Sequence, residues 1–72
     1  MTNIAIDKSF HLLFWDADRF RNFLKSIKLP YRVDELTYTE ENYLLYIEFI
    51  VSISGTSPAA IKQLMESIAE WR

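Results

Sequence analysis

The sequence predicts an α+β fold, a two-layer sandwich whose elements follow one another in the order β-α-β-β-α. Two observations lead to this class. Segments whose apolar residues alternate, as in strands, are separated by segments whose apolar residues recur every three or four positions, as in helices. The chain also has only one glycine and two prolines, and shows no linker or repeat that would divide it. We therefore expect residues 1–72 to form a single small α+β domain.

Composition indicates a folded protein of modest stability. Half of the residues are hydrophobic and 15% are aromatic, which is the opposite of a disordered composition. Folding so short a chain buries only about 60% of the surface that the unfolded chain exposes. There is no cysteine, so neither disulfides nor thiolate metal sites can add stability. Self-association remains as a way to bury more surface.

The start of the chain and its hydropathy favour a cytoplasmic location. Met1, Thr2 and Asn3 lack the basic and apolar regions of a signal peptide. No apolar run approaches the ~20 residues of a membrane span. We therefore expect no membrane partner.

The first predicted element is a buried strand from Ser9 to Trp15, because this segment is too uniformly apolar for an exposed one. Residues 3–6 alternate and predict a short extra amino-terminal strand that turns at Asp7-Lys8. A competing interpretation is a single helix over residues 9–28, since several apolar residues there also keep helical spacing.

The next element is an amphipathic helix that begins at Ala17 and is expected to end before Leu29 and Pro30. Asp16 and Asp18 stand at its start and superficially match the nucleophile and metal ligand of a phosphatase-like site. Such a site also needs a hydroxyl that holds phosphate, a separate lysine and further acids, which 72 residues do not supply. We therefore interpret Asp16 as the helix cap and Asp18 as an acid favoured by the helix dipole.

The second strand is predicted from Tyr31 to Tyr38. Its apolar residues change face along the segment, and this predicts a bulge near Asp34-Glu35. A polar turn follows, in which Asn42 suits a left-handed backbone conformation.

The third strand has the strongest signal, because residues 43–53 alternate without a break and are rich in aromatic and branched side chains. We expect it to be central in the sheet. Gly55 ends it. Ser57 then supplies a helix cap and Pro58 the first helical position of a second helix, which runs to the end of the chain.

This order of elements places both helices on one face of a small, mostly antiparallel sheet. It corresponds to a truncated ferredoxin-like arrangement that lacks the last strand, which describes architecture and not function. The edge where that strand would pair is left open, and offers a route to strand addition by a partner.

The face of this sheet opposite the helices is more apolar than a solvated face should be. The first and third strands both place apolar and aromatic side chains on it, with Glu48 at the rim. A contiguous apolar patch with a polar rim is typical of a contact site. The predicted partner-binding residues are His11, Leu13, Trp15, Leu44, Tyr46 and Ile50.

The residues of catalytic and metal sites are largely missing. His11 is the only histidine, Gly55 is the only glycine, and no serine lies in the context of a nucleophile elbow. We therefore predict no enzymatic activity, no catalytic residue, no metal and no cofactor.

Nucleic acid is the alternative partner. The first helix carries a basic stripe formed by Arg21, Lys25 and Lys28, and aromatic residues on such a sheet can stack bases. However, the glycine and basic residues used by RNA-recognition modules are missing, and Glu48 would repel phosphate. We therefore favour a protein partner.

Charge is unevenly distributed, with five basic residues and no acid in residues 19–33, and five acids and no base in residues 34–48. We expect a small protein-interaction module that forms a homodimer or docks on a larger partner as an adaptor or inhibitor. The apolar face would provide affinity, and the charges would orient the partner.

Overall fold

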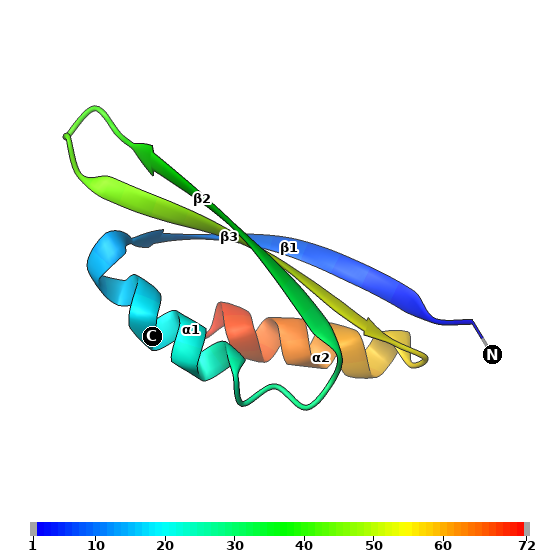
Figure 1. Cartoon of the computed structure of the whole chain (residues 1–72). Coiled ribbons are helices and arrows are strands. Elements are labelled where there is room, and N and C mark those ends of the chain that lie inside the picture. The colour runs from blue at the N-terminus through cyan, green and yellow to red at the C-terminus, as the bar shows by residue number, and fades with distance from the viewer. Residues whose placement is uncertain (1, 72) are drawn as a thin grey trace.

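The computed structural model describes residues 2–71 and has the order of strands and helices that the sequence predicts. It is a small α+β fold with three antiparallel strands in one sheet and two helices (Figure 1). The elements are β1 (Ile4–Leu13), the 3-10 helix η1 (Phe14–Asp16), α1 (Ala17–Leu24), β2 (Tyr31–Thr39), β3 (Leu45–Gly55) and α2 (Pro58–Ala69).

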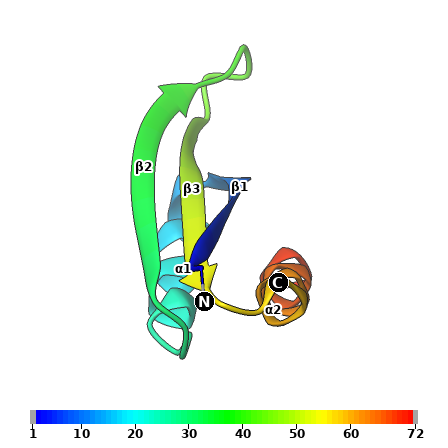
Figure 2. The same cartoon turned by 90° about the vertical axis from the view of Figure 1, so that its right-hand side faces the viewer.

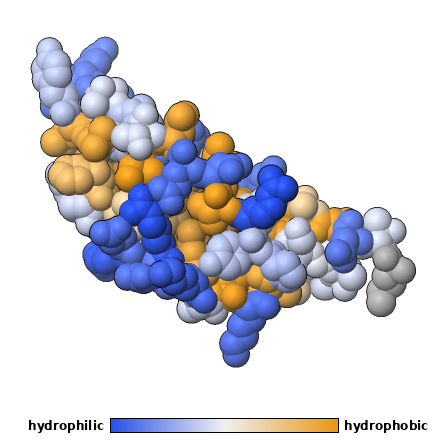
Figure 3. Space-filling view, viewed as in Figure 1, coloured by the Kyte–Doolittle hydropathy of each residue, from blue (hydrophilic) through white to orange (hydrophobic). Residues whose placement is uncertain are grey.

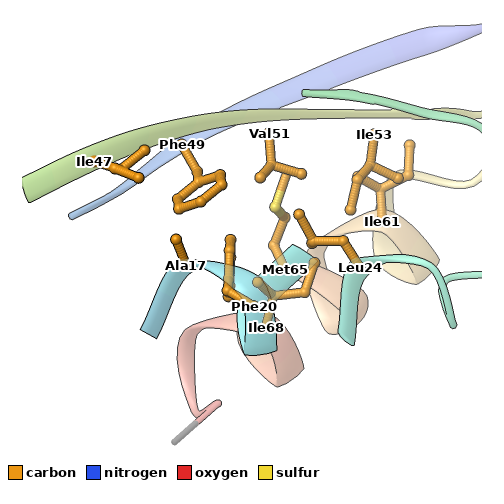
Figure 4. Close-up of a cluster of buried hydrophobic side chains, with 10 residues drawn as sticks. All are labelled: Ala17, Phe20, Leu24, Ile47, Phe49, Val51, Ile53, Ile61, Met65 and Ile68. Carbon is orange, nitrogen blue, oxygen red and sulfur yellow. The ribbon is translucent and has the colours of Figure 1, made fainter. Parts of the chain in front are cut away.

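Strand β3 lies in the middle of the sheet, which has the order β1-β3-β2. It pairs antiparallel with both neighbours. Its position confirms the prediction of a central strand from the unbroken alternation. The odd-numbered side chains from Ile47 to Ile53 are buried because they face the helices, as Figure 4 shows.

The core lies between that row and the two helices. Phe20 of α1 is central to it: its ring centroid lies 4.8 Å from that of Phe49 and 5.6 Å from that of Phe10. Helix α2 closes the core with Ile61, Met65 and Ile68. Both helices therefore lie on the same side of the sheet (Figures 1 and 4). Helix α2 lies on the β1 side of the molecule, away from β2 (Figure 2).

Helix α2 begins as predicted. The Ser57 hydroxyl accepts a hydrogen bond from the amide of Ala60 at 3.3 Å, and Pro58 occupies the first helical position. Proline at this position removes no hydrogen bond from the helix, because the amide of a first-turn residue has no partner within the helix.

Strand β1 differs from the prediction. The separate strand over residues 3–6 and the turn at Asp7-Lys8 are wrong, because β1 is continuous and every residue of it pairs with β3. The eleven residues of β3 offer partners along this whole length, and no glycine favours a turn. The strand also ends at Leu13, so Trp15 lies in η1 instead. The interpretation of residues 9–28 as one helix is wrong as well.

The bulge predicted near Asp34-Glu35 is also wrong. Strand β2 pairs residue for residue with β3 throughout. Its apolar side chains therefore change face without any irregularity: Tyr31 and Val33 face the helices, whereas Leu36 and Tyr38 lie on the opposite side.

The β2–β3 hairpin reaches past the end of β1, whose last residue Leu13 pairs with Tyr46 (Figure 1). In its turn Tyr43, and not Asn42, has the left-handed conformation, with φ 62°. Asn42 instead stabilises the turn through its side-chain oxygen, which accepts a hydrogen bond from the amide of Leu44 at 3.0 Å. Tyr43 itself is 92% exposed.

Within residues 2–71, neither helix combines the length and the apolar content that crossing a membrane requires.

Candidate functional site

The sheet face that points away from the helices has no layer above it in the described part of the chain; we call it the open face. Because the odd-numbered residues of β3 face the core, its even-numbered residues lie on the open face, together with their partners on β1 and β2. The aromatic, apolar and charged residues at its centre are His11, Leu13, Leu36, Tyr38, Tyr46, Glu48 and Ile50.

Four of these side chains, from all three strands, contact one another; we call them the open-face cluster. The cluster consists of His11, Tyr38, Tyr46 and Glu48. The rings of Tyr38 and Tyr46 stack at 5.6 Å with 17° between their planes. One hydrogen bond of 2.9 Å joins His11 Nδ1 to the hydroxyl of Tyr38, and His11 Nε2 lies 3.4 Å from Glu48 Oε2.

The two tyrosine hydroxyls are both engaged, so the stacked rings are held in place. That of Tyr38 bonds to His11, and that of Tyr46 accepts a hydrogen bond from the Asn42 side chain at 3.2 Å. Because these aromatic rings are already ordered, they lose little rotamer freedom when a partner binds, and this favours binding. The cluster is therefore a preformed surface.

The cluster lines a broad, open hollow of about 900 Å³, together with residues 40–42 of the hairpin turn. Three carboxylates, Glu40, Glu41 and Glu48, line the same hollow, and His11 is the one base among the described residues that line it. The pKa of Tyr38 is raised, first because neighbouring atoms remove water from its hydroxyl, and then because the charges of Glu40 and Glu48 disfavour the phenolate. The hollow is thus aromatic and electronegative.

The structure brings together four of the predicted partner-binding residues: His11, Leu13, Tyr46 and Ile50 lie on the open face. Trp15 does not join them. It lies in η1, 55% exposed, with its ring against Phe14. Leu44 is half-buried in the turn before β3.

Sequence reasoning missed Leu36 and Tyr38, which lie opposite Glu48 and Tyr46 on the open face. The predicted bulge would have moved both side chains to the helix side. The signal that identifies them was present, because simple alternation from Tyr31 onward, without a bulge, places them correctly.

The structure keeps two residues of the basic stripe together. Helix α1 ends at Leu24, but Lys25 still has a helical backbone and its amide donates a hydrogen bond to the carbonyl oxygen of Arg21 at 3.3 Å, whereas Lys28 lies beyond the next turn. Helix α1 ends early because Ser26 donates two hydrogen bonds to the carbonyl oxygen of Phe23. Its amide donates at 3.0 Å and its hydroxyl at 2.6 Å.

Arg21, the first residue of the stripe, is already bound to two carboxylates. Its guanidinium donates to Glu35 at 2.9 Å and 2.6 Å, and to Asp18 at 2.6 Å. These hydrogen bonds raise the pKa of Arg21 and lower that of Glu35. Its charge is therefore largely matched within the chain.

The two aspartates before and within α1 act differently from the prediction in one respect. Asp18 lies in the first turn, as expected, and pairs with Arg21. Asp16 makes no capping hydrogen bond, so its predicted role as the cap is wrong. The reason is that η1 runs directly into α1 and gives Asp16 a helical backbone, with φ −91° and ψ −8°, instead of an extended one. Its carboxylate lies 3.7 Å from Arg19 instead.

Among residues 2–71, no three histidine, aspartate or glutamate side chains converge as metal ligands would. Comparison with protein-family models, curated proteins and solved structures finds no match to this chain. The function therefore has to be argued from the geometry of the open face.

Proposed function

We propose that this domain is a protein-interaction module that binds another protein through its open face. It would act as a homodimer or as an adaptor or inhibitor docked on a larger partner. The observation that carries the proposal is the one-sided cover of the sheet: both helices pack on one face, while Leu36 is 58% exposed on the other. Exposed apolar patches with a polar rim mark contact sites.

The composition of the open face supports a protein partner. Tyrosine is among the residues that contribute most to binding energy, and two tyrosines stack at the centre of this face. His11 and Glu48 supply polar groups beside them. In the space-filling view the hairpin tip is hydrophilic, and hydrophobic residues gather below it (Figure 3).

We also propose that the architecture is a ferredoxin-like arrangement without its last strand. In support of this, β3 lies between β1 and β2 in the sheet, as in a split β-α-β unit. The missing strand would pair with the outer edge of β1. That edge is a second route by which a partner could add to the sheet.

Site-specific photo-crosslinking tests the role of the open face. A photoreactive amino acid replaces Leu36 on the open face, or Gln63 on the exposed surface of α2 as a matched control, and the protein is irradiated in its native host. We expect a discrete adduct from position 36 and none from position 63. Adducts of equal yield at both positions, or none at position 36, would contradict the proposal.

Sedimentation at several concentrations then separates the two forms of the proposal. A homodimer dissociates when Tyr46→Glu places a charge in the interface, whereas a docking module is monomeric with and without the substitution. The absence of enzymatic activity stays a prediction.

A further inference from the structure

We propose that the partner inserts a positively charged side chain, an arginine or a lysine, into the hollow around the open-face cluster. This inference rests on the proposed function and adds the chemistry of the partner. It follows from three properties of the hollow: its aromatic floor, its negative charge and, in the described part of the chain, a lining without lysine or arginine.

The aromatic floor suits a cation. A guanidinium or ammonium group is attracted to the face of a tyrosine ring, and more strongly when water is removed. The rings of Tyr38 and Tyr46 both line the hollow, and hydrogen bonds from outside the pair hold them. The binding surface is thus formed before the partner arrives.

The carboxylates around this floor would bind the same cation. Glu40, Glu41 and Glu48 line the hollow, and no lysine or arginine among residues 2–71 does. Among the described residues, Glu48 has only His11 as an ionic neighbour, and neither Glu40 nor Glu41 takes part in an ion pair. A concave surface of one charge sign concentrates partners of the opposite sign.

The same charge argues against two other occupants. A second copy placed by a twofold axis through the hollow would bring two sets of carboxylates together. A nucleic acid would bring phosphates to Glu48, and His11 is the one base among the described residues that line the hollow. A basic segment of a different protein meets neither form of repulsion.

Titration by NMR tests the inference. The probe is the blocked peptide Gly-Ser-Arg-Ser-Gly, compared with Gly-Ser-Gln-Ser-Gly, added to the ¹⁵N-labelled protein. We expect saturable shifts of the Tyr38, Tyr46 and Glu48 amides with the arginine peptide only. Added salt should weaken them, because these charges are partly exposed.

Two variants locate the bound peptide. Glu48→Gln removes one carboxylate, and Tyr46→Leu removes one ring while keeping an apolar strand residue. Each should weaken binding by about two- to fivefold, the range of one exposed cation–π or ionic contact. Glu66→Gln on α2 removes an equal charge away from the sheet and should leave binding unchanged. Should Tyr46→Leu fail to fold, Glu48→Gln decides alone.

The possible results are distinguishable. Equal shifts with both peptides, or arginine-specific shifts that both open-face variants retain, would overturn the inference. Shifts of the same amides on raising the protein concentration without peptide would identify a second copy as the occupant, and shifts with oligouridylate would identify nucleic acid; either would also overturn it. If position 36 still forms a discrete adduct while the peptide does not bind, only the inference fails. If the peptide binds but no adduct forms, the proposed function fails.

Discussion

Two polar residues, Ser57 and Asp16, precede the two helices, and their side chains stabilise the structure in different ways. Ser57 has an extended backbone, with φ −111° and ψ 106°, and its hydroxyl accepts an amide hydrogen bond at the start of α2. Asp16 has a helical backbone and acts only through charge, 3.7 Å from Arg19. A cap gives a hydrogen-bond partner to an amide that would otherwise have none in the helix. An exposed ion pair only replaces the contacts that its charges make with water, so it adds little to stability.

This difference predicts unequal costs of substitution. Ser57→Ala should lower the free energy of unfolding by about 1 kcal/mol, the usual cost of losing a cap. Asp16→Ala should lower it by about 0.5 kcal/mol or less, as for an exposed ion pair near a helix start. Urea denaturation followed by circular dichroism measures both. A larger loss for Asp16→Ala would show that its carboxylate caps α1 after all.

At the scale of elements, one ion pair joins α1 to β2. Glu35 faces the helix layer and accepts two hydrogen bonds from Arg21. These bonds lower the pKa of Glu35, so the folded state holds its carboxylate ionised at a lower pH than the unfolded chain does. The resulting stability is fully present above the ordinary carboxyl pKa and is lost as the pH falls through the lowered value.

Glu35→Gln should therefore reduce the free energy of unfolding near neutral pH, by about 0.2–1 kcal/mol because the pair is partly exposed. The difference from the unsubstituted protein should shrink as the pH falls through the lowered pKa of Glu35, because the protonated carboxyl and the amide that replaces it are both neutral. Glu66→Gln on α2 serves as the control, with little effect at either pH. A difference that does not change with pH would mean that Glu35 acts through packing alone.

In the described part of the chain one edge of strand β1 is unpaired, and a lysine lies on the helix-facing side of this strand. Lys8 pairs with Val51, so both side chains point toward the helix layer, and its ammonium lies 5.8 Å from the ring centroid of Phe10. An inward-pointing charge on an edge strand is a common protection against pairing with other chains.

Replacing this lysine should expose the edge to such pairing. We expect Lys8→Val to increase concentration-dependent association, because an apolar side chain lets another strand pack beside β1. Light scattering over a concentration series measures the effect, and Lys62→Val on the exposed surface of α2 controls for the lost charge. Equal association of the two variants would show that the edge is not what Lys8 protects.

Local pattern was sufficient to predict the central strand, the two helices and the cap at Ser57, because alternation and cap chemistry are properties of adjacent residues. It failed where a remote partner decides the structure. The length of β1 depends on the eleven residues of β3 beside it, and the regular pairing of β2 depends on the same strand. The predicted bulge in β2 is also the reason why Leu36 and Tyr38 were not predicted to lie on the open face.

At the scale of the whole molecule, the domain is elongated. Its Cα atoms extend over 47 × 18 × 16 Å, with a radius of gyration of 13.2 Å. A compact domain of this length would have a radius of about 11 Å. The difference arises because the long strands and the hairpin extend beyond the helices (Figure 1).

X-ray scattering in solution should therefore show a monomer with a radius of gyration clearly above that of a compact domain. A complex formed on the open face should thicken the particle across its short axes without lengthening it, because the partner lies over the sheet and not at its ends. A bound particle that lengthens instead would indicate end-to-end or edge binding.

The hairpin passes the last residue of β1, so its tip is a two-stranded ribbon without the support of a third strand. Ribbons of this kind are only marginally stable on their own. Amide protons between residues 40 and 45 should consequently exchange with deuterium far faster than those between Ile47 and Ile53. A ligand seated at the ribbon's base would slow that exchange at the tip, which makes deuterium uptake there a reporter of occupancy.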